Sequence, residues 1–143
     1  MEKYMKLALK EAEKAYKKGE VPIGAVLIKN GKVIAKAHNL KEKKNIAYYH
    51  AEILVIKKAC KKLKNWRLID CTMYVTVEPC AMCCGAIKES RISNLVYGTL
   101  NENTGFVKSK SEFFHNIKIN ISSGICENEC RKIMQDFFNQ KRK

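Results

Sequence analysis

The order of strand and helix patterns is the sequence feature that most constrains how this chain can fold. Strand patterns at residues 21–29 and 32–37 flank Asn30-Gly31, a dipeptide that favours a two-residue turn between antiparallel strands. Helix patterns separate most of the later strands, and a helix between two strands of one sheet implies that they run parallel. We therefore expect an α/β fold in three layers, α/β/α, with helices on both faces of a mixed five-stranded sheet.

The expected elements follow from apolar periodicity and turn residues. Helices are expected at residues 5–19, 50–63, 79–90 and 126–138, and strands at 21–29, 32–37, 71–77, 95–100 and 117–121. No linker, repeat or low-complexity segment interrupts this pattern. A chain of 143 residues, 46% of them hydrophobic, fits one domain over residues 1–143.

Charge and hydropathy bear on location and partners. The longest stretch without a charged residue, 79–87, is far too short to span a membrane, and the N-terminus has no signal-peptide pattern. We therefore expect a cytoplasmic protein with no membrane association. Lys and Arg total 28 against 14 Asp and Glu, a net charge of +14. This excess is consistent with nucleic-acid binding and also with a merely solubilising Lys-rich surface, and charge alone leaves both readings open.

Seven cysteines, an odd number, argue against a disulfide framework and for reduced thiols or thiolates on a metal. Three of them lie together at residues 80–84. The other four occupy apolar positions of expected elements, and we expect them to pack in the core: Cys60, Cys71, Cys126 and Cys130.

Two short segments carry the chemistry: His50-Ala51-Glu52 and, later in the chain, Pro79-Cys80-Ala81-Met82-Cys83. Cys80 and Cys83 are three residues apart at a helix start, so their sulfurs share one face, where the helix N-terminus favours thiolates. His50 begins another helix after a loop. One nitrogen and two sulfurs form a set that zinc takes, and we expect one Zn²⁺ on these three residues.

Three ligands leave the fourth tetrahedral position open, which is typical of a catalytic zinc rather than a structural one. On a helix Cys84 points about 100° away from Cys83, so it should not reach the same ion. Glu52 is close enough to His50 to bond a zinc-bound water without touching the metal. We expect Glu52 to act as the catalytic acid and base.

These motifs resemble those of the zinc-dependent nucleoside and nucleobase deaminases, which share a cytidine-deaminase-like fold. Within that superfamily the chain is similar to the bacterial tRNA-specific adenosine deaminases, in order and over most of its length. The segments that carry this similarity are Glu20–Val26, His38-Asn39, His50–Ile53, Trp66–Leu68, Thr72–Cys83, Ser90–Ile92 and Asp136–Phe138.

The resemblance implies hydrolytic deamination of adenosine to inosine at the wobble, or first anticodon, position of a tRNA. Zinc-activated hydroxide would attack C6 of the adenine, with Glu52 as the proton shuttle. The resemblance also implies a homodimer with one zinc per subunit that holds the tRNA anticodon stem-loop across both subunits. Asn39 would bind the extruded nucleotide and the backbone at Ala51 the base edge; the other reading of Asn39 is a turn residue at a strand end.

Six residues are candidate RNA contacts: Arg67, Asn101, Phe137, Phe138, Lys141 and Arg142. Adjacent Phe residues on a helix cannot point the same way, so we expect one in the core and one exposed. Arg67 can equally be a surface ion-pair residue. Asn101 stands where the family usually has Asp, which suggests looser discrimination between RNA and DNA. Tyr48-Tyr49 replaces a usual Thr-Ala pair and is expected to narrow the pocket or to stack on a flanking base.

Two other functions stay open. A zinc deaminase of free nucleosides, nucleotides or bases, of the cytosine, guanine or deoxycytidylate type, would share the metal site and Glu52. It would not account for the net charge or the aromatic and basic C-terminal segment. A non-catalytic RNA-binding zinc module predicts a closed four-ligand site and no requirement for Glu52.

Overall fold

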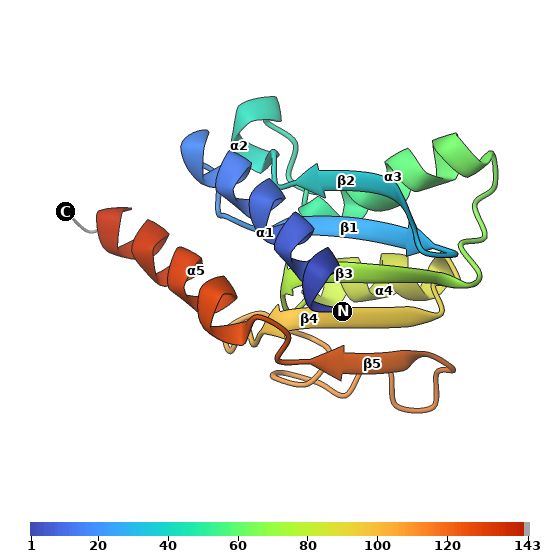
Figure 1. The fold of residues 1–143 in the computed structure, drawn as a ribbon. Helices are drawn as coiled ribbons and strands as arrows, with labels where there is room; N and C mark the ends of the chain where they lie inside the picture. The colour runs from blue at the N-terminus through green and yellow to red at the C-terminus, as the bar shows by residue number, and fades with distance from the viewer. Residues whose placement is uncertain (142–143) are drawn as a thin grey trace.

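The structure is a computed structural model that describes residues 1–141 (Figure 1). The helices are α1 (Glu2–Lys17), α2 (Lys41–Lys44), α3 (Ala51–Leu63), α4 (Ala81–Glu89) and α5 (Glu127–Lys141). The strands are β1 (Gly24–Lys29), β2 (Lys32–His38), β3 (Cys71–Val77), β4 (Asn94–Thr99) and β5 (Asn120–Ser123).

The strands form one mixed sheet in the order β2-β1-β3-β4-β5. β1 pairs antiparallel with β2 and with β3, whereas β3, β4 and β5 run parallel. The β1–β2 hairpin turns at Asn30 and Gly31, whose φ angles of 51° and 72° lie in the left-handed region that such a tight turn requires. The expected hairpin and the mixed five-stranded sheet are therefore confirmed.

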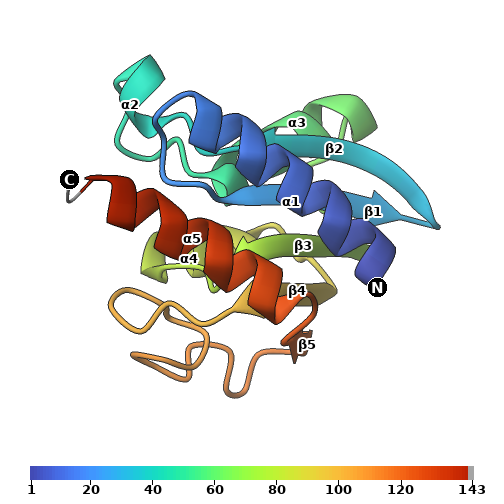
Figure 2. The ribbon, with the colours of Figure 1, turned by 60° about the vertical axis from the view of Figure 1, so that its left-hand side comes forward.

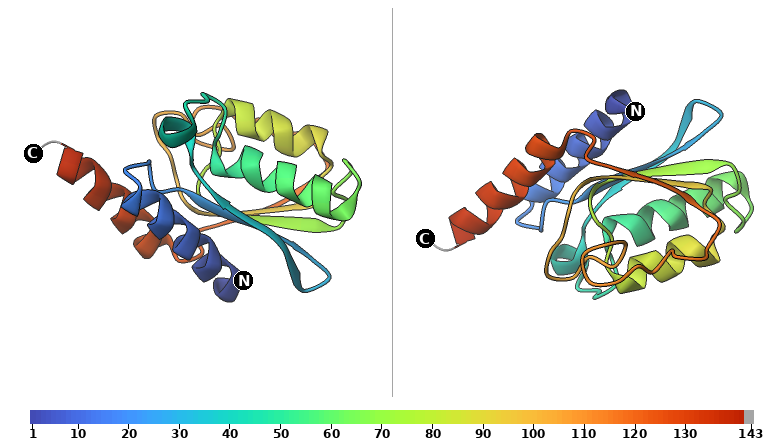
Figure 3. Two further views of the ribbon diagram at one scale, coloured as in Figure 1. Left: turned by 90° about the horizontal axis from the view of Figure 1, so that it is seen from above. Right: turned by 90° about the horizontal axis from the view of Figure 1, so that it is seen from below.

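Helices cover both faces of the sheet, as expected for three layers. Figure 2 shows α1 and α5 side by side over one face, and Figure 3 shows α3 and α4 together on the other. Between the sheet and α3 and α4 lies a large aliphatic core that includes Val55, Ile87 and Val75. A smaller core, with Met5 of α1 and Cys130 of α5, fills the opposite side.

Two glycines let helices approach the sheet closely. A Cβ atom on Gly24 would lie 2.0 Å from the carbonyl oxygen of Ala8 in α1. A Cβ atom on Gly98 of β4 would lie 2.4 Å from Sγ of Cys130 in α5. No larger side chain fits at either position unless the helix moves, so these contacts set the distance of α1 and α5 from the sheet.

Several boundaries differ from the expectation. β1 begins at Gly24 because residues 21–23 form a tight bend, in which the Ile23 N–H donates to the Val21 carbonyl at 2.8 Å. α4 begins after Pro79, and Cys80 is its N-cap with extended backbone angles. The four residues of α2 are too few to show a period in the sequence.

The last strand begins three residues later than the sequence pattern predicts. The alternating isoleucines predict a strand at 117–121, but β5 covers Asn120–Ser123 at the sheet edge, and Ile121 is 38% exposed. The connection from β4 to β5, residues 100–119, contains no helix, although parallel strands are usually joined by one. Side-chain hydrogen bonds hold this connection instead, and they bear directly on the site.

Candidate metal centre and substrate pocket

Two helix starts bring the expected metal ligands together. His50 is the N-cap of α3 and Cys80 is the N-cap of α4. α3 precedes β3 and α4 follows it, so both helices begin beside the carboxyl end of that strand. The positive ends of the two helix dipoles face this point, and they stabilise thiolates there.

The three donor atoms have the spacing of a metal site. Nδ1 of His50 lies 3.7 Å from Sγ of Cys80 and 3.5 Å from Sγ of Cys83. All three donors lie within 4.8 Å of one another. In a tetrahedral zinc site with the usual zinc–nitrogen and zinc–sulfur bonds, a nitrogen and a sulfur ligand lie roughly 3.6 Å apart. The donors therefore fit a tetrahedral ion without rearrangement.

The protonation of these groups favours a cation. The hydrogen bond from the Cys83 thiol, with a contribution from His50, lowers the pKa of the Cys80 thiol to about 4. The same bond and burial raise the pKa of Cys83, and the hydrogen bond to Cys80 raises the pKa of His50. A thiolate thus stands ready in the protein, and a divalent ion would replace the proton that the two sulfurs share.

Glu52 lies beside this donor set in the first turn of α3, buried at 3% exposure. Its Oε1 atom is the one buried side-chain oxygen or nitrogen in residues 1–141 with no hydrogen-bond partner. Burial raises the pKa of the Glu52 carboxyl to about 7. A buried oxygen without a partner is costly to maintain, so the site is suited to a polar molecule that is not part of the chain.

A pocket of about 330 Å³ opens onto Glu52, His50 and Cys80. Ala51 and Asn39 line its wall, as expected of substrate-binding residues. Oδ1 of Asn39 accepts a hydrogen bond from the Lys41 N–H at 3.0 Å, and its amide donates to the Val21 carbonyl at 3.3 Å. Asn39 is therefore a turn residue, as one of the two interpretations expects, and it also lines the pocket; its role in binding the nucleotide stays a prediction.

Two buried carboxylates that the sequence analysis did not single out shape the pocket walls. Glu20 accepts backbone N–H bonds from Glu42 and Lys43 at 3.0 and 2.7 Å and so holds α2. Glu78 accepts hydrogen bonds from the backbone of the 101–109 segment on both of its oxygens. In the sequence, the only local feature of both residues is an acid that stands one or two positions before a proline, in Glu20-Val21-Pro22 and Glu78-Pro79-Cys80. This pattern is too common to predict a buried carboxylate.

The candidate RNA contacts are divided between two ends of the molecule. Asn101 and Phe138 line the pocket, and Phe138 is 43% exposed while Phe137 is buried, which confirms that one Phe lies in the core. Lys141 is the exposed last residue of α5, and Arg142 lies outside the described residues. Arg67 lies past the far end of α3, about 20 Å from the metal ligands at its start, and stacks on Trp66 at 4.4 Å.

The neighbouring residues behave largely as expected. Cys84 turns away from the donor set, and its thiol faces the Pro79 carbonyl at 3.6 Å. Neither Tyr48 nor Tyr49 lines the pocket described here: Tyr48 is 55% exposed and Tyr49 packs against the core. The expectation that these rings narrow the pocket is therefore wrong for the single chain, because the loop turns Tyr48 outward and Tyr49 toward the core. Stacking on a flanking base stays a prediction.

Comparison with known families matches residues 1–142 to the MafB19-like deaminases, the class of protein that this fold and donor set define. The tRNA-specific adenosine deaminase of Bacillus subtilis (strain 168) is 47% identical over 99% of this chain and 91% of that protein. The protein of the same name from Haemophilus influenzae is 40% identical over 99% of this chain and 84% of that protein.

A solved structure from a study of A-to-I editing by tRNA:A34 deaminases superimposes with a TM-score of 0.87 at 41% identity, covering 92% of this chain and 98% of that one. A guanine deaminase from Nitrosomonas europaea reaches a TM-score of 0.85 at 20% identity, covering 95% and 83% of the two chains, and shares the fold. The chain belongs to the family of the tRNA-specific adenosine deaminases.

Proposed function

We propose that this protein converts adenosine to inosine at the wobble position of a tRNA anticodon, by hydrolytic deamination. The observation that carries this proposal is the unpartnered Oε1 of buried Glu52, which lines one pocket with His50 and Cys80, next to the buried Cys83 of the same donor set. Relatives named tRNA-specific adenosine deaminase at 40–47% identity support adenosine in tRNA as the substrate. The donor set supports zinc, which when bound supplies a water whose pKa falls to about 7.

The reaction needs a group that moves protons, and Glu52 is placed to do so. Its oxygen takes a proton from the water that adds to C6 of the adenine and passes it to ring nitrogen N1. It then takes the proton of the new C6 hydroxyl and delivers it to the amino group as the C6–N6 bond breaks and the C6 carbonyl forms, so that adenosine and water give inosine and ammonia. A carboxyl pKa near 7 suits both directions of this transfer at neutral pH.

The pocket walls are suited to a base that has left its stack. Asn39 lines the pocket and its amide has one N–H not used in the contacts to Val21 and Lys41, so it can hydrogen-bond the flipped nucleotide. The backbone at Ala51, in the first turn of α3, holds the base edge. Asn101 and Phe138 flank the entrance and contact the neighbouring nucleotides.

The protein works as a homodimer on the anticodon stem-loop in this proposal. Tyr48 lies two residues before His50, and Met82 lies between Cys80 and Cys83. Their side chains are 55% and 40% exposed and offer apolar surface that a second copy can cover. No helix described within residues 1–141 is long and apolar enough to cross a bilayer. The cytoplasmic location and the single domain over residues 1–143 stay predictions.

The test is inosine formation on a synthetic anticodon stem-loop with adenosine at the wobble position, read by mass spectrometry after digestion. Parallel reactions contain free adenosine, cytidine, deoxycytidylate and guanine. We expect a product only from the stem-loop, loss of activity with a chelator, and recovery with added Zn²⁺. Turnover of a free base or nucleoside with none on the RNA would identify the alternative enzyme class instead.

A further inference from the structure

One side of the molecule holds a disproportionate share of the positive charge. Residues 32–67 contain eleven Lys and Arg but two acidic residues, Glu42 and the buried Glu52, a net of +9 out of the chain's +14. All eleven basic side chains are exposed. They belong to β2, α2, α3 and the turn after α3, and we call them together the basic face.

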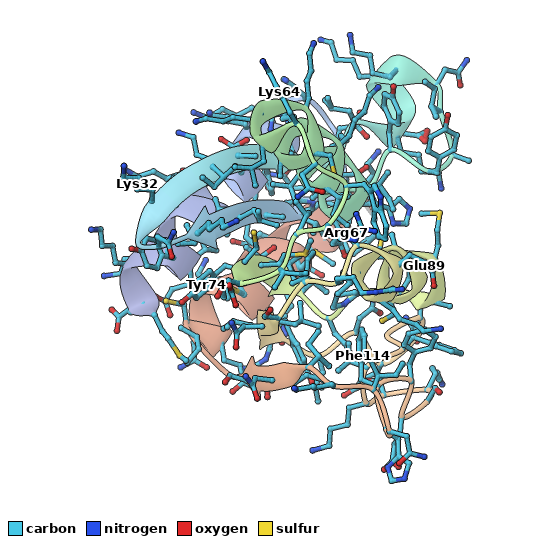
Figure 4. The ribbon with its side chains drawn as sticks, turned by 90° about the vertical axis from the view of Figure 1, so that its right-hand side faces the viewer. Lys32, Lys64, Arg67, Tyr74, Glu89 and Phe114 are labelled. Carbon is cyan, nitrogen blue, oxygen red and sulfur yellow. The ribbon has the colours of Figure 1, made fainter. Side chains whose placement is uncertain are left out.

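The basic face is continuous in space. β2 is an edge strand and α3 packs against it, with Nζ of Lys58 donating to the Lys36 carbonyl at 2.9 Å. Figure 1 places β2, α2 and α3 together at the edge opposite β5. In Figure 4, Lys32 and Lys64 both point outward along this edge.

The basic side chains of this face have no acidic partners. No Lys or Arg of the face lies within 4.0 Å of a carboxylate oxygen of residues 1–141. By contrast, five of the fifteen Lys and Arg described outside this face contact an acid: Lys6, Lys14, Lys88, Arg131 and Lys132. On α3, Lys57 and Lys61, and likewise Lys58 and Lys62, stand four residues apart, where like charges destabilise a helix. A surface that serves only solubility does not require lysines four residues apart on one helix with no acidic partner.

The basic face begins at the pocket and runs away from it. Lys41, at the start of α2, lines the pocket that holds Glu52. α3 starts at the metal ligands and carries its lysines outward for about 20 Å, to Lys64 and Arg67 past its C-terminal end. A nucleic acid with one nucleotide in the pocket can therefore follow the face continuously, whereas Asn101 and Phe138 lie on the other side of the entrance.

We propose that the basic face binds backbone phosphates of the tRNA beyond the anticodon stem-loop, as a second RNA-binding surface of the enzyme. This inference rests on the proposed function and extends it from the anticodon stem-loop to the rest of the tRNA. Exposed lysines suit phosphate oxygens, because the lysine ammonium is a flexible point charge that can reach an oxygen without a shaped pocket. A lipid surface is a poorer fit, because α2 and α3 expose no large hydrophobic side chain, and the exposed aromatic residues of 32–67, Tyr48 and Trp66, lie beyond opposite ends of α3 and form no single patch for insertion.

The experiment compares two variants with the same change of charge. The first replaces Lys57, Lys58, Lys61 and Lys62 by Gln, all on the exposed side of α3 and none in the pocket. The control replaces Lys3, Lys10, Lys17 and Lys118 by Gln, exposed residues outside the basic face. Dissociation constants are measured at several salt concentrations for the full-length tRNA and for its isolated anticodon stem-loop. Thermal melts verify that both variants are folded.

We expect the α3 variant to bind full-length tRNA at least about tenfold more weakly than the control at low salt, with a salt slope smaller by about 3. Its affinity for the stem-loop and its rate of inosine formation on it should match the control. Equal weakening by both variants would mean unspecific attraction, and equal weakening on both RNAs would mean that the contact lies within the stem-loop; either result would overturn the proposal. Unchanged binding of full-length tRNA by the α3 variant would also overturn the proposal. Binding to phosphatidylserine vesicles is measured in parallel, and an α3 variant that loses vesicle binding but keeps tRNA binding would point to a lipid surface instead.

Failure of the proposed function would look different. In that case the unaltered protein would make no inosine on the stem-loop, while the comparison of tRNA affinities between the two variants would still decide whether the basic face binds RNA.

Discussion

Ser109 is bonded twice to the carboxylate of Glu78: its backbone N–H donates to Oε2 at 2.9 Å and its hydroxyl to Oε1 at 2.5 Å. Val107 and Lys108 add two further N–H bonds to Oε2. Gly105 lies so close that a Cβ there would come within 2.4 Å of the same carboxyl group. The connection between β4 and β5 has no helix, so its N–H groups lack the regular backbone hydrogen bonds that a helix would provide. The Glu78 carboxylate accepts several of these N–H groups instead.

We predict that Glu78→Gln loosens the 101–109 segment, because an amide nitrogen cannot accept the N–H bonds that a carboxylate accepts. Amide exchange of residues 107–109 should become faster, and KM for the stem-loop should rise more than kcat falls, because Asn101 on this segment lines the pocket. Ser109→Ala, which removes one of these bonds, should cost only about 1 kcal/mol of stability. Unchanged exchange with full metal content would contradict this role of Glu78.

Replacement of Glu52 by Gln should remove turnover and leave binding of the metal. The amide keeps the shape but cannot carry protons, so we expect kcat to fall by about 10²–10⁴-fold or more. Zinc content is measured on the same sample by elemental analysis. If Glu52→Gln retains full activity, the proton-transfer role is wrong; loss of the metal together with activity would make Glu52 a ligand instead.

The donor set predicts a sharp contrast between adjacent cysteines. Cys83→Ala should abolish stoichiometric metal binding, whereas Cys84→Ala should keep it, because the Cys84 thiol faces the Pro79 carbonyl and not the His50 ring. Both side chains are fully buried, so the pair controls for lost packing. Metal per chain after dialysis measures the outcome, and equal zinc content in the two variants would rule out Cys83 as a ligand.

A pH-dependent contribution to stability is expected from Glu11 of α1. Burial acts to raise the pKa of its carboxyl, but hydrogen bonds from His38 at 2.9 Å and Lys14 at 2.7 Å outweigh it, so the pKa is lowered. A group with a lowered folded-state pKa stabilises the protein above its unfolded pKa of about 4.5 and loses that contribution as the pH falls through the folded value.

Glu11→Gln should therefore lower the free energy of unfolding by about 1–3 kcal/mol at pH 7, and by progressively less below about pH 4.5. Urea unfolding between pH 3.5 and 7 measures this difference, with Glu13→Gln as an exposed control on the same helix. A deficit that stays constant over this range would mean that the Glu11 charge does not contribute.

Asn101 offers a test of the sugar preference. Its amide donates to the Thr104 hydroxyl at 2.8 Å and its carbonyl accepts the Thr104 N–H at 3.2 Å, so a neutral side chain stands at the pocket entrance. We expect comparable deamination rates on RNA and DNA hairpins of one sequence, and a shift toward RNA in Asn101→Asp, because a carboxylate can accept from a 2′-hydroxyl. Strong RNA preference in the unaltered protein would end this hypothesis.

The sequence by itself determined the elements with a strong local signal. Asn30-Gly31 specified the hairpin because few residues adopt two consecutive positive φ angles, and the buried strand at Cys71–Val77 followed from its β-branched composition. The grouping of the His50, Cys80 and Cys83 donors was also predictable, because donor types and helical spacing are local properties. The alternating isoleucines gave the wrong bounds for β5. Alternation marks a strand only where one face is buried, whereas the side chains of this edge strand are largely exposed, with Ile121 at 38%.

Only the tertiary structure decided which groups the buried acids bind and where the lysines gather. Glu20 and Glu78 acquire their partners from segments more than twenty residues away, and no local pattern records such bonds. The basic residues at 32–67 became one surface because β2 and α3 pack together at the sheet edge. Local geometry is encoded by neighbouring residues in the chain, whereas burial and the environment of a charge depend on contacts that only the folded chain makes.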